Sequence, residues 1–195
     1  MARTIAKDHG DKRHAILTAS SKVFTDVGFD RASMAQVAKA CSFSKAALYH
    51  YFPSKNALLF AILERHLSQL TGHVLKLKRL NRSIEEFLAH IVEEILLQYQ
   101  GNDPVHELQI HALGQLDKKE QQILISHMRE LVSYVSEVIS EARPSLTSQG
   151  PENLRMATMS LFGMLNWYYT WNGGRGTEGR REYARFAVQI FLKGV

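Results

Sequence analysis

The amino-acid sequence predicts an all-α protein of about nine helices. Apolar residues recur at steps of three and four along most of the 195-residue chain, which is the spacing of one helix face. No convincing run alternates between apolar and polar residues, as a half-buried strand would. Glycine, proline and hydroxyl residues lie between the periodic segments, where helices begin and end. A chain of this length can bury a proper core and hold one or two domains.

The first predicted helix ends at Gly28, because glycine directly after an apolar stripe is a frequent helix stop. Its apolar stripe consists of Ile16, Ala19, Val23 and Val27. Residues 1–10 are polar and lack periodicity, so we expect a flexible arm before this helix.

Residues 33–52 have the layout of a helix-turn-helix DNA reader. Ser33 can cap a short first helix by accepting hydrogen bonds from its free N–H groups. The apolar stripe of this helix is Met34, Val37 and Ala38. Residues 41–43 interrupt the pattern, and Phe43 is placed to fill the angle between two helices. The alternative is an ordinary helical hairpin in an all-helical core.

The second helix of this motif begins after Ser44, which can cap it. Leu48 and Phe52 share one face, and the rest of the helix presents a lysine, small residues and aromatic groups. Lysine can donate to guanine, alanine methyls can touch thymine methyls, and Tyr49 or His50 can donate to phosphates. The predicted DNA contacts are Ser33, Ser44, Lys45, Ala46, Ala47, Tyr49, His50 and Lys55.

A long fourth helix is expected after Pro53, with Ser54 as its cap. Its apolar stripe is Leu63, Leu67, Leu70, Val74 and Leu77. Further helices are expected at residues 83–100, 103–115, 118–142, 152–171 and 178–193. We expect a polar loop at 145–150, before a proline that opens the helix at 152–171. That helix is apolar around most of its circumference, so other helices must pack against several of its sides. These helices can belong to the same chain or to another subunit.

The positive charge of the chain is confined to its first quarter. Residues 1–56 contain nine lysines and arginines against four acidic residues, which accounts for the whole formal excess of five. The remaining residues hold fifteen of each sign. A basic N-terminal domain on a neutral body suits the neutralisation of DNA phosphates, although a solvated lysine surface would have the same composition.

The segment from Lys12 to Leu67, and above all Ser44–Lys55, closely resembles the N-terminal domain of TetR-type transcriptional regulators. The resemblance implies an all-helical homodimer with a helix-turn-helix DNA-binding domain at residues 11–56. It also implies a ligand-binding and dimerisation domain at residues 57–195. The chain departs from the family pattern in its turn, where Ser42 replaces a usual glycine and Cys41 a small residue. A serine in a left-handed conformation would cost about 1 kcal/mol.

Two further departures concern the second helix of the motif. Ala46 and Ala47 replace the glycine and threonine that the family often carries there. Because of these changes, the resemblance does not predict which operator sequence is read. The expected mode of docking is unaffected.

The last two predicted helices resemble the pair that forms the four-helix dimer interface in these regulators. The dimer contacts that we expect are Phe162, Tyr169, Tyr183, Phe186 and Ile190. The same apolar surface would also suit the core of a monomer. In a dimer, two recognition helices about one DNA turn apart would read a palindrome.

The resemblance also implies an effector pocket inside the body of the protein. Candidate lining residues are His90, Tyr99, His111, Tyr134, Met164, Trp167 and Tyr168, each of which could equally be a core residue. The segment Gly163–Trp171 resembles the C-terminal part of TetR-type regulators that sense acyl-CoA thioesters. Cations that could hold the CoA phosphates are Lys76, Lys78, Arg79, Arg82 and Arg175.

No motif in the sequence supports an enzyme, a metal site or a bound cofactor. His66 and His73 are seven residues apart and His106 and His111 five apart, whereas two ligands on one helix face need a spacing of four. No glycine-rich phosphate loop or nucleophile elbow is present.

Two features favour a cytoplasmic protein that is not inserted in a membrane. The sequence has no run of eighteen apolar residues and no signal peptide at its N-terminus. Its single cysteine excludes an intrachain disulfide, as is usual in a reducing compartment.

The sequence thus predicts a ligand-responsive DNA-binding regulator. We expect a repressor that a small-molecule effector, such as an acyl-CoA, releases from a palindromic operator. One alternative is a repressor of drug efflux with an aromatic pocket. From other classes, the alternatives are a helical adaptor that binds only proteins and a helical metal or hydrolytic enzyme.

Overall fold

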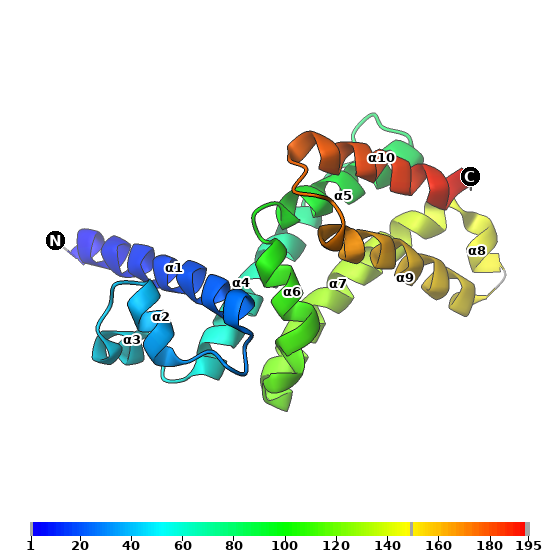
Figure 1. The fold of residues 1–195 in the computed structure, drawn as a ribbon. Helices are drawn as coiled ribbons and strands as arrows, with labels where there is room; N and C mark the ends of the chain where they lie inside the picture. The colour runs from blue at the N-terminus through cyan, green and yellow to red at the C-terminus, as the bar shows by residue number, and fades with distance from the viewer. Residues whose placement is uncertain (1, 149, 194–195) are drawn as a thin grey trace. The chain divides into compact units, whose positions relative to one another are not determined.

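The computed structural model describes residues 2–148 and 150–193, and every regular element among them is a helix (Figure 1). The described residues form ten α-helices and two short 3₁₀ helices, which confirms the predicted all-α class. Contacts between residues divide the chain into two compact units.

The first unit consists of His66 and the described residues before it, together with Pro104–Leu124. It contains α1 (Ala2–Val27), α2 (Met34–Ala40), α3 (Lys45–Tyr51) and the first part of α4 (Lys55–Val74). It also contains α6 (Asp103–Ala112) from Pro104 onward, η1 (Leu113–Gln115) and the first turns of α7 (Lys118–Ala142). Its fully buried apolar residues include Ile16, Phe24, Val37, Leu48, Leu58 and Leu59. Each of α1 to α4 therefore contributes at least one fully buried side chain to this unit.

The second unit consists of Leu67–Asp103 and the described residues from Ile125 onward. It contains the end of α4, α5 (Ile84–Tyr99), most of α7, α8 (Pro144–Ser148), α9 (Pro151–Trp167), η2 (Tyr168–Thr170) and α10 (Thr177–Lys193). Helix α10 packs along α5 (Figure 1). The α5 residues Leu88, Ile91, Val92, Ile95 and Leu96 are all fully buried. A helix buried on so many positions must be covered on several sides, so α5 is the centre of this core.

Several helix boundaries differ from those that the sequence predicts. Helix α1 begins at Ala2, so residues 2–10 have a helical backbone where we expected a flexible arm. No proline interrupts that stretch, and a single glycine, Gly10, is tolerated inside a helix at a cost of about 1 kcal/mol. The stripe that we expected along α1 is only half-buried at Ala19, Val23 and Val27, whereas Phe24 is fully buried.

The expected polar loop at 145–150 is wrong in its first part, because the short helix α8 occupies Pro144–Ser148. Proline fits the first turn of a helix, where its missing N–H has no partner to lose. At the other end, α9 stops at Trp167 and tightens into η2, so it is shorter than the predicted helix at 152–171. The fourth helix likewise ends at Val74, three residues before the last leucine of its predicted stripe.

Candidate DNA-binding surface and ligand sites

Helix α2 is fixed at its start by a reciprocal capping box. The Gln36 backbone N–H donates to Ser33 Oγ at 3.3 Å, and the Ser33 N–H donates to Gln36 Oε1 at 2.8 Å. Two orphan N–H groups of a short helix are thereby satisfied. One face of α2 is buried through Met34, Val37 and Ala38, as the sequence predicts.

The turn after α2 is a Schellman motif with Ser42 in the left-handed position. Ser42 has a φ of 58°. Its N–H donates to the Lys39 carbonyl at 3.2 Å, and the Phe43 N–H donates to the Ala38 carbonyl at 2.9 Å. These bonds satisfy the last carbonyls of α2 although glycine would hold the same conformation at about 1 kcal/mol less cost. The strain that the sequence predicts at Ser42 is therefore present.

Helix α3 is capped at its N-terminus, and only one of its faces is buried. Ser44 Oγ accepts a hydrogen bond from the Ala47 N–H at 3.1 Å. Leu48 is fully buried, and Phe52 is 3% exposed, with the Arg13 guanidinium 5.1 Å from its ring centroid. The opposite side, with Lys45, Ala46, Tyr49 and His50, is exposed. A rigid helix with a free polar face is what major-groove docking requires.

Lys55, one of the predicted DNA contacts, has a structural task inside the unit. Its Nζ donates to the carbonyls of Phe29 at 2.7 Å and Asp30 at 3.1 Å, and it lies 4.5 Å from the centroid of the Phe29 ring. It thus ties the connection between α1 and α2 to the start of α4. No local sequence pattern indicates this role, because the partners of Lys55 are backbone atoms more than twenty residues away.

The predicted effector residues do not line one common cavity. Tyr99 is 5% exposed and donates to Asn166 Oδ1 at 3.1 Å, and Tyr134 donates to the Leu77 carbonyl at 3.4 Å. His111 is exposed and belongs to the first unit, whereas Trp167 is 58% exposed on the second. His90 and Met164 are half-buried, and Tyr168 is buried at a small pocket beside α10.

A larger groove lies between α7 and α9, and its volume is about 750 Å³. Its lining includes Met128, Val132, Ser136, Leu154 and Thr158. The sequence did not predict this groove, because the spacing of Met128 from Leu124 and Leu131 places it on the same apolar face of the helix. In the structure the buried stripe is Leu124, Leu131, Val135, Val138 and Ile139, so Met128 and Val132 are left at the edge.

The predicted dimer contacts differ in exposure. Phe162 is 5% exposed, Tyr169, Tyr183 and Ile190 are half-buried, and Phe186 is 54% exposed. Three further apolar residues of α9 are exposed, Met156, Met159 and Trp167, and none of them is among the predicted dimer contacts. They recur at helical spacing on either side of the exposed Gly163 and form an apolar strip without cover in one chain.

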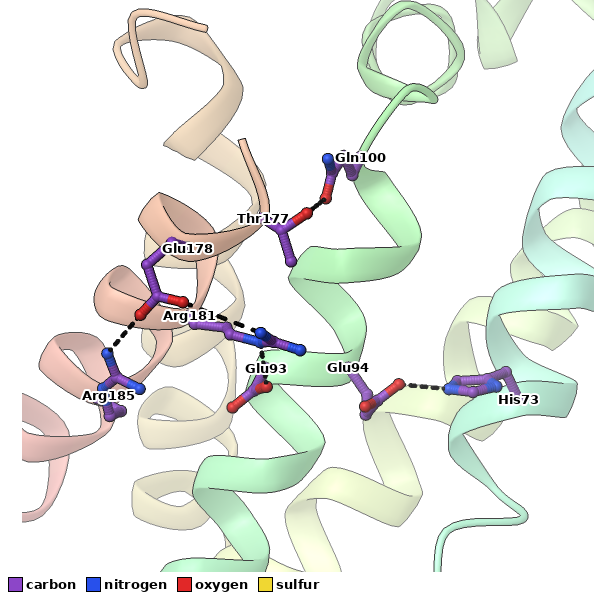
Figure 2. Close-up of polar contacts among 8 residues, drawn as sticks. All are labelled: His73, Glu93, Glu94, Gln100, Thr177, Glu178, Arg181 and Arg185. Carbon is purple, nitrogen blue, oxygen red and sulfur yellow. Dashed lines mark hydrogen bonds and ion pairs between the residues drawn. The ribbon is translucent and has the colours of Figure 1, made fainter. Parts of the chain in front are cut away.

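Polar contacts hold α10 and α4 against α5 (Figure 2). Arg181 Nε donates to Glu93 at 3.0 Å, and Thr177 donates to Gln100 Oε1 at 3.0 Å. On the other side of α5, His73 Nε2 lies 2.7 Å from a Glu94 carboxylate oxygen. These pairs are partly exposed, so each contributes little by itself to stability.

The second unit contains an ion pair whose arginine is buried. The Arg180 side chain is 4% exposed, and its Nη2 lies 2.6 Å from Asp103 Oδ2. Its Nη1 donates to the Leu96 carbonyl at 3.1 Å, and its guanidinium lies 5.7 Å from the centroid of the Tyr168 ring. Arg180 therefore joins the first residue of α6, the end of α5 and the end of α9.

The described residues offer neither a metal-binding cluster nor a membrane-spanning helix. No group of three or more histidine, cysteine, aspartate or glutamate side chains is arranged to hold a metal ion. Within the same residues, every helix is too short or too polar to cross a bilayer.

Two family models together match most of the chain. Residues 16–62 match the model of bacterial regulatory proteins of the tetR family, and residues 81–195 match that of the tetracyclin repressor-like C-terminal domain. The transcriptional activator FasR of Mycolicibacterium smegmatis is 33% identical over 113 residues, which cover 52% of this chain and 51% of that protein. The match thus spans about half the length of this curated relative.

Solved structures resemble the chain over nearly its whole length. A TetR-family transcriptional regulator from Bordetella parapertussis 12822 has a TM-score of 0.86 and 30% identity, with 93% of this chain and 94% of that chain covered. AibR, solved in complex with isovaleryl coenzyme A and operator DNA, has a TM-score of 0.75 and 24% identity. Its match covers 93% of this chain and 98% of that chain, and at this identity it supports the fold alone.

Proposed function

Because the chain belongs to the TetR family of bacterial regulatory proteins, we propose that it is a ligand-responsive regulator whose dimer binds a palindromic operator. The observation that carries the proposal is the exposed face of α3, held by the Ser44 cap and by the buried Leu48. The excess of positive charge in residues 1–56 supports it, because phosphate neutralisation provides a large share of the affinity of DNA-binding proteins for DNA.

The uncovered apolar side chains of α9 and α10 support dimerisation through these two helices. Met156, Met159, Trp167 and Phe186 are each more than half exposed in the single chain. A second copy would remove this surface from water and bring two α3 helices onto one DNA duplex. Two such helices about one helical turn apart read the two halves of a palindrome.

Replacing Tyr49 with alanine is expected to weaken operator binding about tenfold while dimerisation is unchanged. Tyr49 is 43% exposed on the free face of α3, so its removal leaves the buried anchor intact. The measurement is a gel-shift titration with the DNA upstream of the protein's own gene, alongside sedimentation of the free protein. Tyr49→Phe is the matched variant, because it keeps the ring and removes only the hydroxyl that would donate to phosphate. Unchanged affinity of Tyr49→Ala would show that α3 does not dock as proposed.

The proposed effector is an acyl-CoA thioester that releases the repressor from its operator. In support, AibR, which shares the fold, binds isovaleryl coenzyme A. In this chain, the connection between α4 and α5 presents the cations Lys76, Lys78 and Arg82, which suit the phosphates of CoA. Arg79 is less suited, because it pairs with Glu141 and donates to the Arg82 carbonyl. Effector binding would release DNA only if it favours a dimer whose α3 helices have the wrong separation.

Addition of acyl-CoAs of increasing chain length is expected to dissociate the complex of protein and operator, whereas free CoA is not. The double variant Lys76→Ala, Lys78→Ala should need about tenfold more acyl-CoA for the same dissociation, because two phosphate partners are lost. Calorimetry of the protein without DNA measures effector binding directly. The acyl-CoA proposal fails if no acyl-CoA produces heat. Strengthened DNA binding would instead indicate an activator, as FasR is named.

A further inference from the structure

An exposed arginine of α1 lies beside the C-terminal end of α3. The guanidinium carbon of Arg13 is 5.1 Å from the centroid of the Phe52 ring. Phe52 caps α3 at its C-terminus, and its backbone N–H donates to the Leu48 carbonyl at 3.0 Å. A cation at this distance is attracted to the face of an aromatic ring. Arg13 is not one of the DNA contacts predicted from the sequence.

Arg13 lies at the edge of the core of the first unit. Ile16 and Leu17 follow it by three and four residues, so they share its face of α1, and both are buried. At the next residue, Arg65 of α4 donates to His14 Nδ1, which holds this turn of α1 against α4. Arg13 itself is exposed. Its stem therefore begins at the edge of the core, and its charged end remains in water.

The guanidinium of Arg13 has donors to spare, whereas the ammonium of Lys55 does not. To the residues that the structure describes, the Arg13 guanidinium forms neither a hydrogen bond nor an ion pair. A free guanidinium presents five N–H groups in a fork that matches the oxygens of a phosphate. Lys55 uses two of its three N–H groups on the carbonyls of Phe29 and Asp30. Arg13 is therefore the better equipped of the two to bind an anion.

A cation beside the end of α3 would lie near a DNA strand in the proposed complex. Helix α3 has seven residues and is therefore about 10 Å long, whereas the major groove of B-DNA is about 12 Å wide. The two sugar-phosphate strands border this groove, so the ends of a docked α3 lie close to phosphates. Phosphate contacts fix the orientation of a protein on the duplex without reading its sequence.

We propose that Arg13 binds a backbone phosphate beside the C-terminal end of α3, with its guanidinium held over the Phe52 ring. This contact presupposes the DNA binding proposed above. The ring restrains the guanidinium before DNA arrives, so less side-chain freedom is lost on binding. The contact is ionic and independent of base sequence, so it contributes to the affinity for every duplex. A dimer makes two such contacts, one beside each α3.

The test is the salt dependence of DNA affinity, measured by fluorescence anisotropy with two duplexes. One is the DNA upstream of the protein's own gene, and the other is a shuffled sequence of the same length and composition. Each phosphate contact adds about 0.9 to the slope of log affinity against log salt concentration. Arg13→Gln removes two contacts from a dimer, so its slope should be lower by about 1.8 with both duplexes. An unchanged slope would overturn the proposal.

Arg13→Lys separates the charge of this residue from its shape. It keeps the positive charge but loses the flat guanidinium that lies over the ring. The slope should therefore equal that of the parent protein, while affinity falls about two- to threefold. A slope as low as that of Arg13→Gln would show that the arginine acts through the fold rather than through its charge, and the proposal would fail.

Lys22→Gln is the matched control, because it removes one positive charge from an exposed position of the same helix. Lys22 lies nine residues after Arg13, which is about two and a half turns and thus the opposite side of α1. Its slope should equal that of the parent. Equal reductions in Lys22→Gln and Arg13→Gln would indicate a general effect of net charge and would contradict a specific contact.

Circular dichroism and sedimentation of each variant provide the check on fold and oligomeric state. Arg13→Gln should match the parent protein in both, since Arg13 is exposed and its neighbours Ile16 and Leu17 stay buried. If the parent binds neither duplex, the proposed regulatory function fails together with this contact. If the parent binds both duplexes and Arg13→Gln keeps its slope, the contact at Arg13 alone is refuted.

Discussion

Replacing Arg180 with methionine is expected to lower the free energy of unfolding by about 3 kcal/mol. The Arg180 side chain is 4% exposed and pairs with Asp103, whose side chain is 30% exposed. Methionine fills much of the same space but leaves the Asp103 carboxylate and the Leu96 carbonyl without their donor. The loss comes mainly from these abandoned groups, since a partly buried charge without a partner is costly.

Urea unfolding at one fixed protein concentration measures this loss, because the proposed dimerisation would make apparent stability depend on concentration. The matched control is the next residue. Arg181→Met removes an ion pair with Glu93, but that arginine is 44% exposed, so the expected loss is under about 1 kcal/mol (Figure 2). Equal losses in the two variants would show that the burial of Arg180 does not matter to its contribution.

Acidification from pH 6.5 to pH 4 is expected to destabilise the first unit by about 3 kcal/mol through one histidine. Burial, with a smaller contribution from His106, lowers the pKa of His66 to about 4. Above pH 6.5 the imidazole is neutral in both the folded and unfolded states. Below that pH the unfolded chain gains a proton that the folded chain accepts only near pH 4. Stability therefore falls with falling pH across this window and is restored on neutralisation.

The measurement is the free energy of unfolding at several pH values for the parent protein and for His66→Leu. Other groups also titrate, so the difference between the two pH curves isolates His66. The curve of His66→Leu should be flatter between pH 6.5 and 4. His111→Gln is the control for the loss of a histidine from the same unit, because that histidine is exposed on the same α6 as His106. Parallel curves for His66→Leu and the parent would refute the assignment.

Local sequence signals predicted the helix-turn-helix because its determinants lie within a few residues of one another. The Ser33 cap, the strained Ser42 and the Ser44 cap each act on backbone groups at most three residues away. The exposed face of α3 could therefore be placed from the sequence. The role of Lys55 could not, because its carbonyl partners are brought to it by the packing of distant segments.

The sequence was less informative about which face of a helix is buried when two faces are apolar. On α10, Phe186 is apolar but 54% exposed, whereas the structure buries Arg180, Ala184, Ala187 and Val188. Periodicity gives the spacing of a stripe but not which partner covers it. A buried arginine is also invisible to hydropathy, since its burial depends on Asp103, 77 residues away.

Cys41 caps the C-terminus of α2 and precedes the strained turn, so it is a site for selective chemical labelling close to the proposed recognition helix α3. It is the chain's one thiol, so a thiol-reactive spin label would attach at one position in each copy. Burial raises the pKa of this thiol, which favours labelling at mildly alkaline pH. In a dimer on a palindrome, the two labels would lie near recognition helices that are on the order of 34 Å apart. Pulsed electron paramagnetic resonance would then measure the distance between the two labels. That distance reports the separation of the two α3 helices and its change when an effector binds.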